Sequence, residues 1–380
     1  MSLCVKSLKV TYNPINEINT FTNGDWVSGQ VTLEVVKDCQ IDSLLIKFKG
    51  KADVLWSERY GQTTVVYHAK DKYFSFKHYF IQEKNIGGND NQPLLRNNNG
   101  ETCNSVIAPG CHVYPFTFQI PFENIPSSFK GSVGKIVYSL EARLHRSLRI
   151  DKTDSAFITF VSKGDLNTVP CLMTPQHESK DKKMKVFSSG TVSMDVDIEK
   201  TGFYQGEGLK VLACIQNNSS REIRPKYCVY RKHSFFAKGK RKIHTKDLCK
   251  EVGDPIPPST NQKVTRIITI PHDVEPSILN CSIIKVEYRV RVYLDIKFAS
   301  DPAIKFPIII LPASHVPAME PPPAASGFGF EPFGNLNPPV WGFVPPQPQP
   351  PPAPQPFDAP PPYEAHGMYP SFTDVGTKYQ

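Results

Sequence analysis

Apolar and polar residues alternate with a period of two along much of the chain. Between residues 286 and 298, the apolar positions are Val286, Tyr288, Val290, Val292, Leu294, Ile296 and Phe298. Polar residues such as Glu287 and Arg289 stand between them. A period of two is typical of a β-strand with one buried and one solvated face. We therefore expect antiparallel sheets that pack face to face.

The pattern occurs twice in the chain. Residues 118–144 align with residues 268–294 at an offset of 150 positions without a gap, and eight of the 27 aligned positions are identical. Average composition gives roughly two identities by chance. Pro126 matches Pro276, and Tyr138 matches Tyr288. The sequence therefore predicts an internal duplication of one fold.

Similar alternation predicts strands in the rest of both copies. They cover residues 5–12, 26–36, 44–56, 63–67, 73–81 and 114–120 in the first copy, and 192–198, 226–231, 263–270 and 304–311 in the second. Within residues 202–215 of the second copy, Gly206-Glu207 precedes a further strand, as Gly24-Asp25 does in the first. Gly50 lies in register within its strand, which indicates a bulge or a close approach of another segment. We find no convincing amphipathic helix of ten or more residues. The predicted fold class is all-β, with two tandem antiparallel β-sandwich domains.

Composition divides the chain into domains and a tail. We predict a first sandwich at residues 1–162, a linker at 163–186 with the charge run Lys180-Asp181-Lys182-Lys183, and a second sandwich at 187–311. Residues 83–101 are polar and rich in Gly and Asn, which predicts a surface loop. Residues 312–380 hold 20 of the 36 prolines and a charge of −4, against +8 for the whole chain, so they are predicted to be a disordered tail.

Cysteine usage and hydropathy indicate a cytoplasmic protein. The nine cysteines are an odd number without a Cys-x-x-Cys pair, and Cys4 and Cys214 lie in strand-like runs, as free thiols do in a reducing compartment. The first residues run directly into a strand and lack the apolar region of a signal peptide. No apolar run approaches the length of a membrane span.

Several segments resemble the α-arrestins, the arrestin domain-containing protein family. They are Gly24-Asp25-x-Val27-x-Gly29-x-Val31, residues 109–121, Phe236-Ala237-Lys238-Gly239-Lys240, and residues 276–288, the most specific block. The resemblance covers the whole chain and is nearest to the subgroup of arrestin domain-containing protein 3. It implies two sandwiches joined by a short hinge. Members near this subgroup usually carry two Pro-Pro-x-Tyr motifs, whereas this chain has one complete copy.

The tail motif is Pro360-Pro361-Pro362-Tyr363. Pro360 and Pro361 favour the polyproline II conformation that aromatic grooves of WW domains accept, and Tyr363 supplies a ring for a second pocket. A chance tyrosine in a proline-rich linker is the alternative. The resemblance implies that the motif recruits HECT-type ubiquitin ligases and brings them to membrane receptors or transporters. Tyr369-Pro-Ser-Phe372 also fits a short sorting pattern for clathrin adaptors, although an unpatterned tail explains it more simply.

A basic segment precedes the second copy of the duplicated pattern. Residues 221–250 contain eleven Lys and Arg against two acidic residues, a local excess of +9. Its centre, Lys238, Lys240, Arg241 and Lys242, suits anionic phospholipids or phosphorylated receptor tails. A solvated strand edge is an equally good interpretation. Aromatic interleaving and a basic helix are absent, so nucleic acid is not an expected partner.

We find no catalytic constellation, no metal site and no cofactor motif in the sequence. Residues 131–135 lack the spacing of a phosphate loop, and Cys111-His112 lacks two further zinc ligands at suitable spacing. The expected function is a non-enzymatic adaptor that links membrane cargo to ligases for endocytosis and sorting, at the plasma membrane and endosomes. The alternative is a coat or retrieval subunit that acts through its sandwiches alone.

Overall fold

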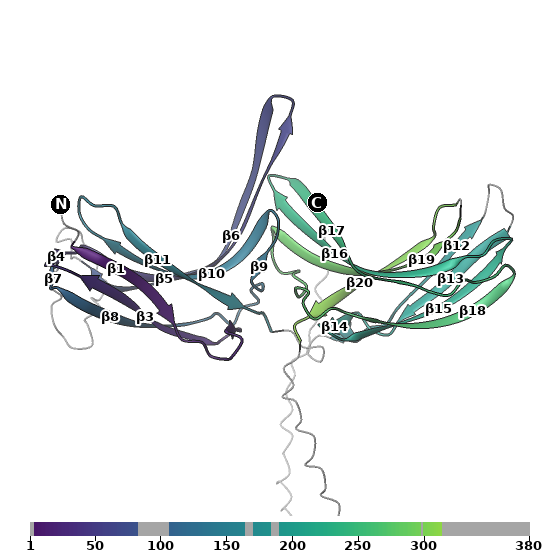
Figure 1. Cartoon of the computed structure of the whole chain (residues 1–380), viewed down its shortest axis with the longest axis horizontal. Helices are drawn as coiled ribbons and strands as arrows, with labels where there is room; N and C mark the ends of the chain where they lie inside the picture. The colour runs from purple at the N-terminus through teal and green to yellow at the C-terminus, as the bar shows by residue number, and fades with distance from the viewer. Residues whose placement is uncertain (1–3, 83–105, 164–169, 184–189, 298, 314–380) are drawn as a thin grey trace, which may run out of the picture. The chain divides into compact units, whose positions relative to one another are not determined.

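The computed structural model describes residues 4–82, 106–163, 170–183, 190–297 and 299–313 (Figure 1). These residues are almost entirely strands and connections, and the one helical element among them is the 3-10 turn η1, Pro170–Met173. The predicted all-β fold is confirmed. No helix in the described ranges is long and apolar enough to cross a membrane. The predicted loop at residues 83–101 and the tail from residue 314 lie outside the described residues.

The first sandwich is built from two sheets and a short additional pair. Its strands are β1 (Val5–Tyr12), β2 (Thr20–Phe21), β3 (Trp26–Val35), β4 (Cys39–Gln40), β5 (Ser43–Tyr60), β6 (Thr63–Gln82), β7 (Val106–Ile107), β8 (Gly110–Gln119), β9 (Phe129–Lys130), β10 (Gly134–His145) and β11 (Lys152–Phe160). One sheet has the order β1-β3-β8, and the other has β2-β11-β10-β5-β6 with β9 beside β10. β4 pairs with β7.

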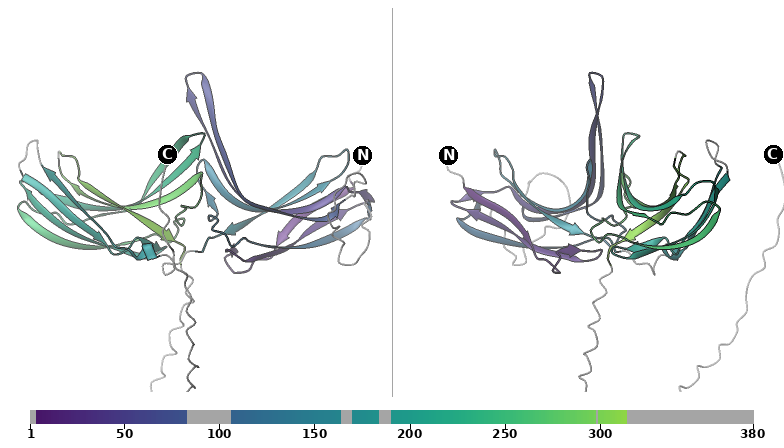
Figure 2. Two further views of the ribbon diagram at one scale, coloured as in Figure 1. Left: turned by 180° about the vertical axis from the view of Figure 1, so that it is seen from behind. Right: turned by 45° about the vertical axis from the view of Figure 1, so that its right-hand side comes forward.

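The second sandwich has the same two-layer construction, which both views in Figure 2 show. Its strands are β12 (Gln176–Lys183), β13 (Gly190–Ile198), β14 (Gly202–Tyr204), β15 (Gly208–Ser219), β16 (Arg224–Ala237), β17 (Lys240–Val252), β18 (Thr260–Thr269), β19 (Ile284–Asp295) and β20 (Ala303–Leu311). The sheet orders are β12-β13-β15-β18 and β14-β20-β19-β16-β17. Among the described residues, strand pairing is antiparallel except for β2 with β11 and β14 with β20, which are equivalent parallel pairs.

The duplication seen in the sequence is also a duplication of structure. β10 and β19 cover residues 134–145 and 284–295, so the two strands begin and end at positions separated by the same offset of 150. The Tyr138 hydroxyl donates a hydrogen bond to the carbonyl of Pro126 at 2.6 Å, and the Tyr288 hydroxyl donates to the carbonyl of Glu275. Both sandwiches therefore fix the start of the hairpin with the same buried tyrosine.

A second shared feature is the turn that precedes β3 in one copy and β15 in the other. Gly24 and Gly206 have φ angles of 82° and 81°, a region that favours glycine. The carboxylates of Asp25 and Glu207 each accept a hydrogen bond at 2.7 Å from the backbone N–H three residues earlier. Gly24-Asp25 and Gly206-Glu207, which resemble each other in the sequence, therefore form the same kind of turn.

The long strand β5 explains one wrong prediction and one correct one. A Cβ atom on Gly50 would lie 2.6 Å from the ring of Tyr138 and 2.8 Å from that of Phe74, and the register shifts after Gly50, as predicted. The two separate strands predicted at 63–67 and 73–81 are wrong, because β6 is continuous. β5 offers a backbone partner to residues across this whole stretch, and an exposed face tolerates the polar side chains between the apolar runs.

Part of the predicted linker is also a strand. β12 lies within residues 163–186 and pairs with β13 from Gln176 to Lys183. It is the edge strand of its sheet, and five consecutive residues of its eight, 177 to 181, are exposed. Charged side chains at an edge oppose pairing with another chain. The charge run that suggested a connector is therefore equally compatible with an edge strand.

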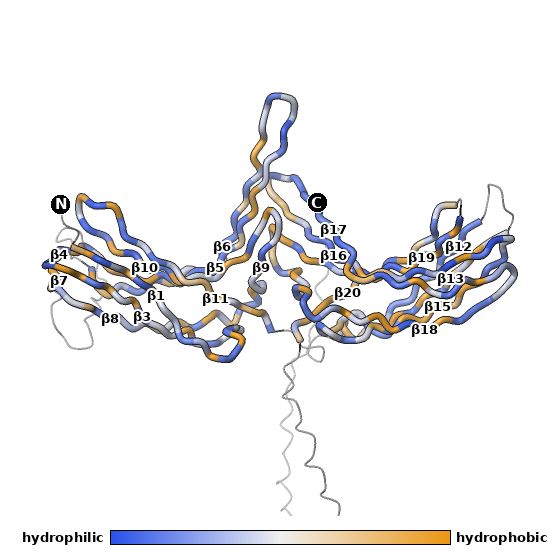
Figure 3. The backbone as a smooth tube through the Cα atoms, viewed as in Figure 1, coloured by the Kyte–Doolittle hydropathy of each residue, from blue (hydrophilic) through white to orange (hydrophobic). Residues whose placement is uncertain are grey.

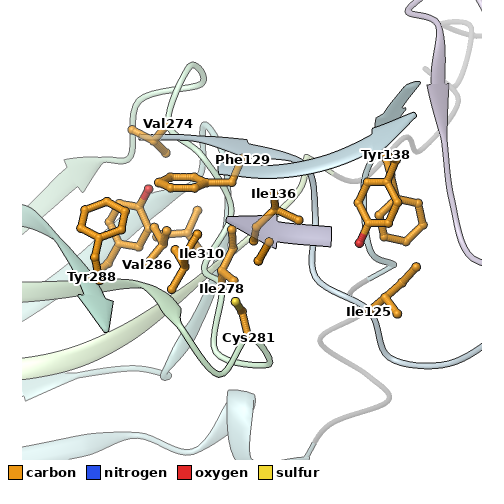
Figure 4. Packing of buried hydrophobic residues seen from close by; sticks show 14 of the residues in the cluster. Ile125, Phe129, Ile136, Tyr138, Val274, Ile278, Cys281, Val286, Tyr288 and Ile310 are labelled. Carbon is orange, nitrogen blue, oxygen red and sulfur yellow. The ribbon is translucent and has the colours of Figure 1, made fainter. Parts of the chain in front are cut away.

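The cores follow the predicted alternation. Residues 286, 288, 290, 292, 294 and 296 are all buried, and the intervening residues are partly exposed. Figure 3 shows the same alternation as orange and blue bands along the strands. Figure 4 shows Tyr138 with Ile125 in one group and Tyr288 with Val286 in another, so the duplicated tyrosines lie among apolar side chains. Burial of these side chains from water is the main term that favours the folded state.

Candidate anionic-ligand surface

The predicted basic residues lie at the tip of the hairpin formed by β16 and β17. Ala237 pairs with Lys240, so Lys238 and Gly239 form a two-residue turn. Their φ angles are 49° and 72°. Two successive positive φ angles are typical of a type I′ turn, which matches the twist of the adjoining strands. The turn therefore presents Lys238 at the end of a tight hairpin.

The two strands of the hairpin differ in burial. β16 lies between β19 and β17 and buries Tyr227, Val229 and Phe235. β17 is the edge strand, and most of its side chains are exposed. Figure 3 accordingly shows β17 as largely hydrophilic. The hairpin is thus anchored by β16, while β17 is free to carry charge.

The cations of β17 separate onto two faces. Side chains alternate along a strand, so Lys240, Lys242, His244 and Lys246 share one face. Lys242 pairs with buried Phe235, and directly paired residues point to the same side of a sheet. We call these four residues the cationic face. They point to the side of the sheet that covers the core, but they lie on the edge strand, where the core has ended.

Arg241 points to the opposite side and is held by other residues. Its guanidinium donates to the Ser234 hydroxyl at 2.7 Å and lies 3.5 Å from the carboxylate of Glu287. It also stands 5.3 Å from the ring centre of Phe236, a cation–π distance. Arg241 therefore stabilises the hairpin, with part of its charge matched by Glu287.

Many of the other basic residues at 221–250 form ion pairs with carboxylates. Six of the eleven cations are in such ion pairs, namely Arg224, Lys226, Arg231, Lys232, Arg241 and Lys250. Lys238 donates to the carbonyl of Val66 in β6 at 2.9 Å. Within the described part of the chain, no ion pair joins Lys240, Lys242 or Lys246. The unmatched positive charge is therefore concentrated on the cationic face.

An open depression lies beside this face. It has a volume of about 450 Å³ and is lined by Lys130, Gly131, Ser132, Arg231, His233, His244, Thr245, Lys246 and Glu275. The Ser132 hydroxyl and His244 Nδ1 are 3.4 Å apart across it. Arg231 is paired with Glu275, so Lys130 and Lys246 are the cations that an anionic group would meet here.

His233 contributes no positive charge to the depression near neutral pH. Burial, followed by the charge of Arg231, lowers its pKa to about 4. The ring packs edge-on against Phe129 at 5.1 Å, and its Nε2 is buried without a hydrogen-bond partner among the described residues. His233 is therefore a neutral part of the wall of the depression.

An acidic side chain also lies near the cationic face. The pKa of Glu58, at the end of β5, is lowered first by a hydrogen bond from the Tyr60 hydroxyl and further by the charges of Lys242 and Lys240. Glu58 is partly exposed, so solvent screens part of this attraction. An anionic ligand that binds Lys240 and Lys242 would compete with Glu58.

The other predicted sites are either outside the described residues or separate from this surface. Pro360, Pro361, Tyr363, Tyr369 and Phe372 lie outside the described ranges. The exposed Cys111 adjoins His112, whose Nε2 lies 2.8 Å from the carbonyl oxygen of Ala108. Among the described residues, no three His, Cys, Asp or Glu side chains come together as a metal site would require.

The sequence pattern missed two members of this surface. Lys246 lies on the same strand face as Lys240 and Lys242, and the period of two could have placed it there. Lys130 comes from β9, more than a hundred positions earlier. No local pattern indicates that two such distant segments line one depression.

Comparison with known proteins agrees with the architecture. The model of the arrestin N-terminal domain matches residues 8–167, and that of the arrestin C-terminal domain matches residues 188–315. Arrestin domain-containing protein 4 of Mus musculus is 31% identical over 309 residues, which is 80% of this chain and 72% of the relative. The Homo sapiens protein of the same name is 31% identical over 309 residues, which is 80% of this chain and 71% of the relative.

A further relative is more distant. Thioredoxin-interacting protein of Homo sapiens is 27% identical over 315 residues, 80% of this chain and 74% of the relative. The more specific assignment of the chain to the subgroup of arrestin domain-containing protein 3 stays a prediction. Two matched domains and a 31% identical relative are sufficient for the family. This chain belongs to the α-arrestins, the arrestin domain-containing branch of the arrestin family.

Proposed function

We propose that this α-arrestin is a non-enzymatic adaptor. In this proposal its sandwiches bind membrane receptors or transporters, and its tail binds WW domains of HECT-type ubiquitin ligases, so that cargo is ubiquitinated, internalised and sorted. The observation that carries the proposal is Pro360-Pro361-Pro362-Tyr363 in the tail of an arrestin-family chain. The proposed location is the cytoplasm, peripheral to the plasma membrane and endosomes.

The motif suits weak, reversible recruitment. A preformed polyproline II segment loses little conformational entropy when it docks. With one complete motif, the tail gains no avidity from a second WW contact in the same chain. We therefore expect micromolar affinity, on the order of −8 kcal/mol or weaker, for a WW domain of a HECT ligase.

Titration calorimetry with a peptide spanning residues 359–370 tests this proposal. Tyr363→Ala should abolish most of the binding, because it removes the ring and hydroxyl that the second pocket accepts. Tyr369→Ala is the matched control, since it changes a tyrosine outside the motif. Equal affinities of the wild-type and Tyr363→Ala peptides would exclude the ligase adaptor and favour the coat or retrieval subunit.

We propose that the hairpin tip and cationic face contact anionic phospholipid headgroups. Lys238, Lys240, Lys242 and Lys246 are the residues proposed for this contact, with Arg241 as a support for the hairpin. Each basic side chain near an anionic surface contributes about 1 kcal/mol. The unmatched lysines gathered on one edge strand support this role, because charges already paired within the protein gain less from a membrane.

Sedimentation with phosphoinositide-containing liposomes tests the membrane contact. Changing Lys240, Lys242 and Lys246 together to Glu should weaken binding, and added salt should do the same, because exposed charges are screened over roughly 8 Å at physiological ionic strength. The matched control reverses Lys180, Lys182 and Lys183 on β12, with the same change in net charge. Equal losses in both variants would show that net charge alone determines binding.

The sorting pattern supplies a third, independent proposal. Tyr369 and Phe372 would bind clathrin adaptors in an extended conformation, which leaves the WW motif available. A pull-down with an adaptor subunit should lose binding when Tyr369 is changed to Ala and retain it with Tyr363→Ala. The opposite pattern, or no binding by the wild-type tail, would exclude this contact.

A further inference from the structure

Two cysteines that are distant in the sequence meet at one end of the first sandwich. Cys4 immediately precedes β1 and Cys39 begins β4, and their sulfur atoms lie 2.6 Å apart. Cys39 is 2% exposed, whereas Cys4 is half-buried. One thiol of the pair is therefore accessible to a small reagent, and the other lies directly behind it.

The backbone holds both cysteines in place. The N–H of Val36 donates to the carbonyl of Cys4 at 2.9 Å, and Val5 pairs with Val35, so the start of β1 is tied to the end of β3. Cys39 pairs with Ile107 in β7. A disulfide requires a sulfur separation of about 2.0 Å, so a bond could form with a movement of a fraction of an ångström.

A guanidinium lies beside the accessible thiol. Arg146 Nη1 is 3.3 Å from the Cys4 sulfur, and Nε of Arg146 is buried without a hydrogen-bond partner among the described residues. A cation next to a cysteine favours the thiolate, the form that reacts with peroxides and disulfides. The positive charge of Arg146 can therefore stabilise a thiolate on Cys4.

The balance of interactions differs between the two thiols. Burial raises the pKa of Cys4, but hydrogen bonds from Cys39 and Arg146 and the charge of Arg146 outweigh it, so the net pKa is lowered. Burial and the interaction with Cys4 raise the pKa of Cys39, with Arg146 opposing them. Cys4 is thus the thiol that loses its proton first, and Cys39 is its protonated neighbour.

We propose that Cys4 and Cys39 are a peroxide-oxidisable dithiol site, with Cys4 as the attacking thiol, Cys39 as the resolving thiol and Arg146 as a positioning residue. The Cys4 thiolate attacks a peroxide oxygen, forming an S–O bond and breaking the O–O bond; for hydrogen peroxide, the hydroxide released becomes water on protonation. The Cys39 sulfur then attacks the sulfenic acid, forming the S–S bond and releasing the second water. Two thiols are oxidised, and one peroxide is reduced to two waters.

The other described cysteines lack this combination. Cys111 and Cys171 are exposed, and within the described residues neither is in contact with another thiol. Burial raises the pKa of Cys228 and of Cys249. Exposed single thiols and thiols whose pKa is raised therefore serve as internal comparisons for the rate at Cys4.

The experiment treats the fully reduced, full-length chain with limiting hydrogen peroxide. Remaining thiols are alkylated, and the protein is digested and mapped by mass spectrometry without reduction. We expect the first disulfide to link the peptides of Cys4 and Cys39, with the loss of two hydrogen atoms, and to be reversed by a thiol reductant. Oxidation of Cys111 or Cys171 while Cys4 and Cys39 remain alkylatable would overturn the proposal.

Variants separate the roles of the three residues. Cys39→Ser should leave a sulfenic acid on Cys4 that dimedone traps, whereas Cys4→Ser should form no such adduct at Cys39. Arg146→Gln should slow the oxidation of Cys4 by roughly three-fold or more, because it removes the cation that favours the thiolate. Arg149→Gln is the matched control, since Arg149 is an exposed arginine in the same turn. Equal rates for both arginine variants would refute the role of Arg146, and the wild-type peptide map remains decisive if a cysteine variant fails to fold.

Discussion

Tyr138 and Tyr288 show how one residue fixes the same structure twice. Both are about 1% exposed, and each hydroxyl donates to a carbonyl that precedes its strand. Tyr138→Phe leaves the buried carbonyl of Pro126 without its donor, which should cost about 1–3 kcal/mol of unfolding free energy. Urea denaturation followed by circular dichroism measures this cost. The exposed Tyr60→Phe should cost less than about 0.5 kcal/mol, and equal costs would contradict the role of the buried bond.

His233 makes the stability of the second sandwich depend on pH. Its pKa of about 4 lies below the value of 6.5 expected for an exposed histidine, so the unfolded chain binds a proton more readily. The contribution is fully present above pH 6.5 and is lost as pH falls towards 4. Between pH 7.5 and pH 5 the loss should be about 2 kcal/mol, by the pKa difference.

Urea denaturation at these two pH values tests the expectation. His233→Gln should reduce the difference in unfolding free energy between pH 7.5 and pH 5 by about 2 kcal/mol, since glutamine does not titrate. The exposed His244→Gln is the matched control in the same hairpin. An unchanged pH dependence in His233→Gln would show that His233 is not the group responsible.

At the scale of elements, the tip of the β16–β17 hairpin depends on one glycine. Gly239 has a φ of 72°, and a Cβ atom placed on it would meet nothing within 4 Å, so backbone conformation alone disfavours other residues there. Gly239→Ala should cost about 1–2 kcal/mol, the typical cost of the left-handed conformation. Gly239→Asn is the control, because asparagine tolerates this region better. Thermal unfolding measures both variants, and equal Tm values for Gly239→Ala and Gly239→Asn would contradict this explanation.

The elements also show what a single sequence predicts well. The strands β10 and β19 were predictable, because their alternation is a local pattern and because their repeat at 150 positions is visible in the sequence itself. The continuity of β6 was not predictable, because it depends on pairing with all of β5. The pairing of Arg241 with Glu287 was not predictable either, since Glu287 lies in another strand. Contacts between distant segments decide these features, and the local pattern does not contain them.

Chemistry between distant segments follows the same rule. Cys4 occurs in strand-like sequence and Cys39 lies between two predicted strands, but only the pairing of β1 with β3 and of β4 with β7 brings their sulfur atoms together. Lys130 and Lys246 likewise belong to strands of different sandwiches. Sequence motifs therefore predict sites in short linear segments, such as Pro360–Tyr363, more readily than sites assembled by the fold.

At the scale of the whole molecule, charge divides the chain into two parts of opposite sign. The 69 residues from 312 to 380 carry −4, which leaves +12 for residues 1–311 out of the net +8. The described core lies entirely between Val5 and Leu311. The proposed membrane contact belongs to the basic part, whereas the proposed ligase contact belongs to the acidic part. The two activities should therefore be separable by truncation.

A chain that ends at Ala313 tests this separation. We expect its Tm and β-type circular dichroism to match those of the full-length protein, because it retains every described core residue. WW-domain binding should be lost with the motif, while binding to anionic liposomes should be retained or strengthened, because removing the tail removes net negative charge. Full-length Tyr363→Ala is the control, which should lose WW binding and leave liposome binding unchanged. Loss of liposome binding on truncation would place the membrane contact in the tail, against the assignment to Lys240, Lys242 and Lys246.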